Sequence, residues 1–250
     1  MNRQATASAI RILGVRVDNL DLAQAVDRIL AFVEEGRPRQ VVTLNPEFVM
    51  RAQHDAVFRA VLEGADLAVP DGVGLLLAAR YLGTPLRGRA TGVEITLTLA
   101  ARAAERGLTL YLLGAQPGVA EEAAAQLGKR APGLRIAGTY AGSPSLEEET
   151  EIVERIRKAA PDILLVAYGA PQQDLWIARN LERLAVPVAI GVGGVFDYLS
   201  GRVPWAPASW RRLGLEWLYR LVHQPWRWRR MLALPRFTLA VLVSRLRGRR

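Results

Sequence analysis

Short apolar runs alternate with longer segments of helical periodicity between residues 12 and 191. The runs with the length and pattern of strands are 12–17, 40–44, 67–69, 108–113, 134–138, 162–168 and 188–191. Helices are predicted at 22–33, 47–62, 73–82, 93–106 and 175–184, with two more that end near Gly128 and Ala160. Strands that alternate with helices through short glycine-rich turns predict an α/β fold. We expect a Rossmann-like parallel sheet with helices on both faces.

Two of these helices carry recognisable start signals. Asp21 stands where it can cap the 22–33 helix, and Ser145 with Glu148 matches a capping box for the helix that ends near Ala160.

The composition changes sharply near Gly201, which predicts a catalytic core of residues 1–201 and a helical appendage of residues 202–250. The chain has a net charge of +9, but twelve arginines and a single acid, Glu216, lie in the appendage, so the core is close to neutral. The same appendage holds five of the six tryptophans, namely Trp205, Trp210, Trp217, Trp226 and Trp228. Arginine mixed with tryptophan is typical of surfaces that sit at lipid headgroup level.

Helices are predicted in the appendage at 209–222, 226–234 and 237–246, with a break at Pro235. The longest apolar run there has about seven residues, whereas a membrane span needs roughly 20. We expect the appendage to lie on a membrane without crossing it.

The absence of cysteine excludes disulfides, zinc–thiolate sites and thiol catalysis. The two histidines, His54 and His223, are far apart in sequence, which argues against a histidine metal site. Residues 1–10 lack the apolar stretch of a secretory signal, so a cytoplasmic protein is expected.

Polar or glycine-rich turns follow several predicted strands. In a parallel sheet these turns meet at one edge, where open α/β sheets bind ligands, and their main-chain amides suit a phosphorylated ligand. The turns contain Thr43 and Asn45, Asp71 and Gly72, 114–118, 169–174, and 191–197 with Asp197. The alternative is that the glycines only make tight strand-to-helix turns.

Asp71 is the candidate catalytic residue, because it ends a buried strand at this edge and a carboxylate can act as a general base. Asp71 could equally cap the following helix, with Gly72 allowing the turn.

The glycine-rich segment 191–197 only partly matches a dinucleotide fingerprint, because it lacks the third glycine and follows the last strand. The sequence also has no Walker loop and no Asp-x-Asp pair for a metal. We therefore expect neither a cofactor nor a metal, and arginines would have to offset the charge of a departing diphosphate.

The motifs in these turns, taken together and in this order, resemble the WecG/TagA/CpsF glycosyltransferases over about residues 10–235. The matching segments are Thr43-Leu44-Asn45-Pro46, Val69-Pro70-Asp71-Gly72, Arg89-Ala90-Thr91-Gly92, Gly169-Ala170-Pro171-Gln172-Gln173-Asp174, Gly193-Gly194-Val195-Phe196-Asp197 and the tail segment 214–221.

This resemblance implies an inverting, metal-independent hexosyltransferase that serves cell-surface polysaccharide synthesis. It would move N-acetylmannosamine, its uronic acid or a related hexose from a UDP-sugar to a polyprenyl-diphosphate-linked sugar. The implied partners are those two substrates and the inner surface of the cytoplasmic membrane.

The resemblance also implies roles for individual residues. Asp71 would be the general base, and a set of arginines in the appendage would close over the diphosphate. The residues implied to line the pocket are Thr43, Asn45, Arg89 and Gln173, and the arginines are Arg220, Arg227 and Arg230. The chain departs from the family pattern at Gln172, Asp174 and Trp205, which leaves the donor sugar open.

The residues taken alone allow simpler interpretations. Thr43 and Asn45 could form a turn and a helix cap, and Gln173 could be a surface residue at a helix start. Arg89 could be a solvated loop arginine. Asp197 could accept hydrogen bonds from a ribose or base, or cap the next segment, and the tail arginines could form an ordinary basic surface.

Two hypotheses from other classes compete with the transferase. A protein that binds nucleic acid through its basic tail would bind with an affinity that falls steeply as the salt concentration rises. A nicotinamide-dependent oxidoreductase would be stabilised by its cofactor. We favour the transferase and expect no nucleic-acid partner; the sequence leaves open whether the chain forms a homo-oligomer.

Overall fold

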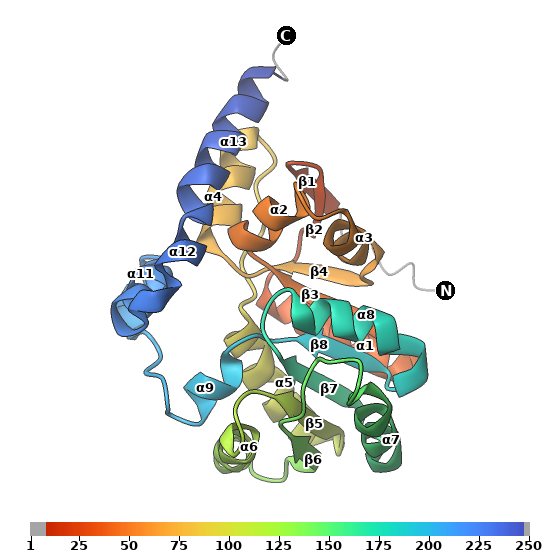
Figure 1. The fold of residues 1–250 in the computed structure, drawn as a ribbon. Helices are drawn as coiled ribbons and strands as arrows, with labels where there is room; N and C mark the ends of the chain where they lie inside the picture. Colours follow the sequence, from red (N-terminus) through yellow and green to blue (C-terminus); the bar gives the residue numbers. More distant parts are fainter. Residues whose placement is uncertain (1–8, 248–250) are drawn as a thin grey trace.

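A six-stranded, fully parallel sheet forms the centre of the computed structural model, which describes residues 9–247 (Figure 1). Its strand order is β4-β3-β8-β7-β5-β6. The strands are β3 (Arg39–Leu44), β4 (Leu67–Pro70), β5 (Thr109–Gly114), β6 (Arg135–Tyr140), β7 (Ile163–Ala167) and β8 (Val188–Gly191). The predicted α/β fold with a parallel sheet is confirmed.

Thirteen α-helices and one 3-10 turn are seen within the described residues. Those of the core are α1 (Leu22–Glu35), α2 (Pro46–Ala52), α3 (Ala56–Gly64), α4 (Val73–Leu82), α5 (Gly92–Arg106), α6 (Val119–Arg130), α7 (Glu149–Ala159), α8 (Gln172–Leu184) and α9 (Val195–Leu199). The predicted appendage is called the tail from here on. Its described helices are α10 (Ala208–Arg212), α11 (Glu216–His223), η1 (Pro225–Arg227), α12 (Trp228–Met231) and α13 (Ala233–Arg247).

Helices cover both faces of the sheet, and successive residues of a strand point to opposite faces, so nearly every residue of the strands other than β6 is buried. Val41 and Leu165 pack beneath α1, α5 and α6. Val42 packs with α2, α3 and α4, and Val166 packs with α7 and α8. This double cover explains why the strands read as continuous apolar runs in the sequence.

The chain diverges between β3 and β8, which are neighbours in the sheet. The connection after β3 enters α2 on one face, whereas the connection after β8 enters α9 on the other. Loops that leave adjacent parallel strands in opposite directions open a crevice at the carboxyl ends of those strands.

Several predicted boundaries are wrong in informative ways. The 12–17 strand is a hairpin of β1 (Ala9–Ile12) and β2 (Val15–Asp18), which turns at Leu13 and Gly14 with positive φ angles of 49° and 81°. The predicted 47–62 helix is two helices, because Asp55 accepts a hydrogen bond from the Phe58 amide and starts α3.

The structure confirms the predicted cap of α1 and contradicts two other predictions, the capping box at Ser145 and the break at Pro235. Asp21 forms the predicted cap of α1, completed by Gln24. The capping box predicted from Ser145 is absent, since α7 begins at Glu149 without a side-chain cap. Pro235 does not break the tail but lies in the first turn of α13, where a missing amide hydrogen is tolerated.

The predicted tail helices are also divided. Gly214, with a φ of 70°, separates α10 from α11, and α13 packs along α2 and α4 (Figure 1). Phe237 and Val241 of α13 are buried in the same core cluster as Phe48. Among the described residues, no helix combines the length and apolar character that crossing a membrane requires.

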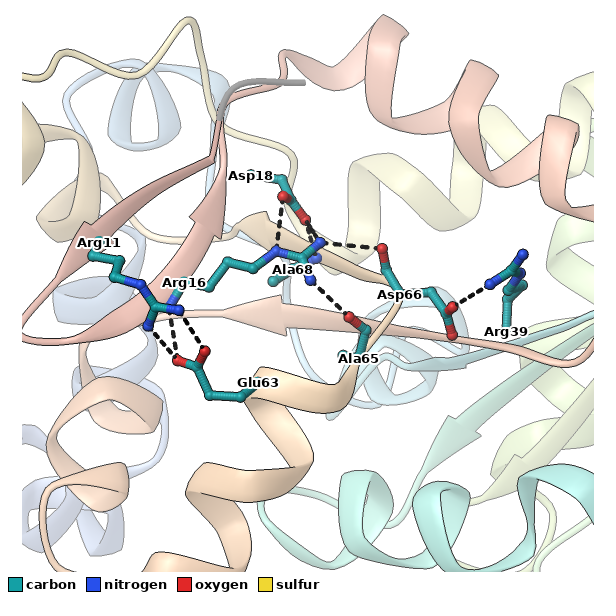
Figure 2. Close-up of polar contacts among 8 residues, drawn as sticks. All are labelled: Arg11, Arg16, Asp18, Arg39, Glu63, Ala65, Asp66 and Ala68. Carbon is teal, nitrogen blue, oxygen red and sulfur yellow. Dashed lines mark hydrogen bonds and ion pairs between the residues drawn. The ribbon is translucent and has the colours of Figure 1, made fainter. Parts of the chain in front are cut away.

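The N-terminal hairpin is fastened to β4 by buried polar contacts (Figure 2). Asp18, only 4% exposed, accepts a hydrogen bond from the Ala68 amide at 2.8 Å and forms a two-point pair with Arg16. Arg16 also donates to the carbonyls of Ala65 and Asp66. These contacts hold the strand that ends at Asp71.

We predict that Asp18→Ala lowers the free energy of unfolding by about 2–4 kcal/mol, because it leaves the Ala68 amide unpaired and the Arg16 guanidinium without its carboxylate. Asp18→Asn should lose less, since its amide oxygen can still accept from Ala68. Urea denaturation measures the difference.

The exposed pair of Arg11 and Glu63 supplies the control (Figure 2). Arg11→Gln should change the unfolding midpoint far less than Asp18→Ala. Equal effects of the two variants would show that burying the Asp18 contact adds nothing to the free energy of unfolding.

Candidate active site

A cavity of about 610 Å³ opens at the carboxyl ends of β3, β4, β7 and β8. Its size is typical of a site for a small ligand. The tail covers it, with lining residues drawn from α11 through α13. The cavity is lined by all nine residues singled out from the sequence, namely Thr43, Asn45, Asp71, Arg89, Gln173, Asp197, Arg220, Arg227 and Arg230.

Asp71 follows β4 directly and is fixed by its own main chain. Its amide donates to the Leu44 carbonyl at 2.7 Å, which joins it to the end of β3. Asp71 does not cap α4, because Gly72 holds the cap position and no side-chain bond is made there. Its carboxylate instead accepts from the Gly92 amide at the start of α5.

The surroundings of Asp71 favour its protonated form. Burial raises the pKa of Asp71 well above its usual range, and the nearby charge of Glu216 raises it further. The Gly92 amide and the Arg89 guanidinium act in the opposite direction. Asp71 therefore holds a proton more strongly than an exposed aspartate does.

Arg89 is an ion-paired residue and not a solvated loop arginine. Its guanidinium lies 3.0 Å from a carboxylate oxygen of Glu216 and donates to the Arg211 carbonyl. The loop that carries Arg89 is itself held to β4, because the Ala90 amide donates to the Pro70 carbonyl at 2.8 Å. Arg89 therefore connects the core beside Asp71 to the tail.

Thr43 and Gln173 shape the wall formed by the turn after β8. The Thr43 hydroxyl donates to the Gly191 carbonyl at 3.0 Å. The Gln173 carbonyl oxygen accepts from the Gly193 amide at 2.9 Å, and its side chain is 1% exposed. Gln173 is thus a buried residue of α8 rather than a surface residue at a helix start.

The sequence allows both Asn45 and Asp197 to be helix caps, and only Asn45 is one. Asn45 does cap α2, accepting from the Phe48 amide at 3.1 Å, and it also lines the cavity. Asp197 lies inside α9 and makes no cap. Burial raises the pKa of Asp197, while Arg220 and Arg227 lower it.

Three arginines of the tail converge from three successive elements, α11, η1 and α12. Gln224 joins the first two, because its carbonyl oxygen accepts from both Arg220 and Arg227. Arg220 reaches the turn after β8 and lies over the Tyr198 ring, 5.0 Å from its centroid. A side chain at Gly194 would collide with this guanidinium.

The positive charge of Arg227 is disfavoured by its surroundings. Burial, followed by the charges of Arg220 and Arg230, lowers the pKa of Arg227 to about 10. Arg230 is balanced by a two-point pair with Glu47 at 2.8 and 3.0 Å. Cations crowded in this way would gain most from a bound anion.

Comparisons with known proteins agree with this geometry. Residues 10–250 match the model of the "Glycosyl transferase WecG/TagA/CpsF family". The chain belongs to this family. Two bacterial relatives are named N-acetylglucosaminyldiphosphoundecaprenol N-acetyl-beta-D-mannosaminyltransferase, and each is 34% identical to it.

The two relatives cover most of both sequences. The Bacillus spizizenii protein aligns over 211 residues, 84% of this chain and 81% of its own length. The Bacillus subtilis protein aligns over 202 residues, 81% and 78% respectively. The chain is therefore a glycosyltransferase of the hexosyltransferase type, which argues against the oxidoreductase and nucleic-acid-binding hypotheses.

The sequence did not predict several polar residues at the cavity or beside it, among them three that hold the predicted arginines in place. Glu216 pairs with Arg89, Glu47 pairs with Arg230, and Gln224 bridges the other two arginines. Glu216 had one signal, since it is the single acid among the arginines of the tail.

We predict that Glu216→Gln moves the acidic limb of the pH–rate profile of this transferase to lower pH. The negative charge of Glu216 raises the pKa of Asp71, so its removal lowers that pKa and leaves Asp71 unprotonated at more acidic pH. The measurement is kcat/KM as a function of pH.

Glu216→Asp keeps the charge and should leave that limb near its wild-type position. A limb that stays in place in Glu216→Gln, or moves to higher pH, would contradict electrostatic coupling between Glu216 and Asp71.

Proposed function

We propose that the protein transfers N-acetylmannosamine, or a closely related hexose, from a UDP-sugar to a polyprenyl-diphosphate-linked sugar. The transfer inverts the anomeric configuration and uses no metal. The carrying observation is that Asp71 and three arginines line one cavity. The names of the two relatives, which specify an N-acetylmannosaminyl group and an undecaprenyl diphosphate acceptor, support this choice.

In this mechanism Asp71 takes the proton of the acceptor hydroxyl as that oxygen attacks the anomeric carbon. The bond between the anomeric carbon and the phosphate oxygen breaks on the opposite face, which inverts the configuration. UDP leaves with its electron pair, and guanidinium groups offset the charge that develops on it. Thr43, Asn45, Arg89 and Gln173 would position the sugars.

The nucleotide side of the cavity would lie at the turn after β8. Asp197 could accept a hydrogen bond there from a ribose or base. Arg220 reaches this turn, and Arg227 lies next to it through Gln224. Both arginines would then contact the diphosphate of the donor.

The tail, residues 202–250, would close the site and bring the enzyme to the cytoplasmic face of the membrane. Its exposed surface mixes apolar and basic groups, with Trp226 71% and Trp228 53% exposed beside the exposed Arg229. Arginine near an anionic leaflet and tryptophan at headgroup level favour such a location. The lipid-linked acceptor would be found there.

We predict that Asp71→Asn lowers transfer by at least about 10²-fold, because the amide cannot accept the proton of the hydroxyl. Binding of the UDP-sugar should persist, since the amide keeps the shape of the carboxylate and can still accept from Gly92. Transfer is measured with UDP-N-acetylmannosamine and a polyprenyl-diphosphate-linked N-acetylglucosamine, and binding by thermal shift. Wild-type turnover in this variant would remove Asp71 from the mechanism.

We predict that Arg227→Gln lowers kcat on the order of 10²-fold, because a buried cation that faces the leaving diphosphate is lost. Arg229→Gln is the matched control, since Arg229 lies two residues away on the exposed side of the tail. Single-turnover rates with saturating UDP-sugar separate the two variants. If both lose activity equally, the tail arginines act through general charge rather than through the site.

A further inference from the structure

A second, apolar cavity of about 270 Å³ lies between α4 and α13, which run side by side (Figure 1). We call it the α4/α13 groove. Its walls include Leu77, Ala78 and Tyr81 from α4 and Phe237, Val241 and Leu242 from α13.

The groove has few polar groups, which belong to the Thr238 and Tyr81 side chains. The Thr238 hydroxyl donates to the Leu234 carbonyl at 3.1 Å. The Tyr81 ring is covered by the Arg245 guanidinium, 4.3 Å from its centroid. The groove therefore offers an incoming ligand mainly hydrocarbon surface.

The groove adjoins the 610 Å³ cavity, because Pro46, Gly74 and Leu234 line both. Arg230 stands at this junction, since it binds Glu47, the neighbour of Pro46, and lies one helical turn before Leu234. From Asp71 outward, the character of the two cavities changes from polar, through cationic, to apolar.

The outer part of the groove faces solvent through large apolar side chains. Leu77 is 63% exposed and Leu242 is 40% exposed. Leu77 and Leu242 thus place exposed hydrocarbon on both walls of one groove, where an apolar ligand can cover it.

We propose that the α4/α13 groove binds the first isoprene units of the acceptor. This proposal rests on the proposed function. A polyprenyl-diphosphate sugar has the same order of groups as the two cavities, with a polar sugar, an anionic diphosphate and an apolar chain. The sugar would face Asp71, the diphosphate would lie near Arg230, and the chain would leave between Leu77 and Leu242 toward the bilayer.

The test compares two acceptors that share one diphosphate-linked N-acetylglucosamine, one with a polyprenyl chain and one with a methyl group. UDP-N-acetylmannosamine is the donor, and both acceptors are assayed in detergent solution. Wild-type enzyme should show a lower KM for the polyprenyl acceptor, because hydrocarbon in an apolar groove adds affinity.

The groove variant Leu77→Gln with Leu242→Gln should raise the KM for the polyprenyl acceptor by about tenfold or more. Its KM values for the methyl acceptor and for the donor should stay unchanged. A second variant, Thr238→Trp, fills the groove and should have the same selective effect. Two variants of opposite design guard against the case in which one fails to fold.

The matched control replaces two leucines of α13 that are at least as exposed as Leu77 and Leu242 but lie outside the groove. Leu239 is 63% and Leu246 is 64% exposed, and Leu239→Gln with Leu246→Gln should leave both KM values unchanged. An equal rise in groove and control variants would overturn the proposal, because general adsorption to lipid would then explain it.

Two other results would also overturn it. If the groove variants change the sedimentation coefficient and not the chain-length preference, a second copy of the protein occupies the groove. If wild-type enzyme uses both acceptors with the same KM, the chain is not bound at all. Failure of the proposed function is distinct, since wild-type enzyme would then transfer to neither acceptor.

Discussion

The ion pair between Arg89 and Glu216 joins the tail to the core beside Asp71. Arg89 comes from a loop that is hydrogen-bonded to β4, and Glu216 begins α11. Their charges act in opposite directions on the pKa of Asp71, Glu216 raising it and Arg89 lowering it. One contact therefore both helps to hold the tail over the cavity and, after burial, contributes to the pKa of the Asp71 carboxyl.

The sheet places this contact at the carboxyl ends of its strands, where open α/β sheets bind ligands. Connections leave β3 and β8 toward opposite faces, and the opened crevice is braced by Thr43 from one strand and Gln173 from α8. Both side chains hold the glycine-rich turn after β8. The backbone of that turn is thus fixed by hydrogen bonds within the protein, which reduces the reorganisation that ligand binding requires.

Most of the sheet could be predicted from the sequence, because buried parallel strands give apolar runs and their ends carry glycine or a capping residue. The sequence predicts one helix at 47–62 and one strand at 12–17, whereas the structure has two helices and a hairpin there. Asp55 and the Leu13-Gly14 turn interrupt patterns that otherwise stay apolar. These errors came from short-range turns that leave hydrophobic spacing intact.

The candidate site divides along the same line. Residues at strand ends, such as Thr43 and Asp71, could be proposed because strand order alone brings them together. The partners that tune the site could not, because they depend on contacts far apart in sequence. Glu216 lies 127 residues from Arg89, and Glu47 lies 183 residues from Arg230.

The helical spacing of the tail places Arg230 and the apolar residues of α13 on the same side of the helix. Arg230, Leu234, Phe237 and Val241 are spaced four, three and four residues apart, and Leu232 between α12 and α13 keeps a near-helical backbone. Such spacing puts successive residues on one side of a helix. The side that carries the Arg230 guanidinium at the cavity of about 610 Å³ therefore continues, one turn later, as the apolar wall of the α4/α13 groove. A shift of one residue between Arg230 and Leu234 would rotate one of these surfaces away from α4, so charge and hydrocarbon stay in contact with the same core only at this length.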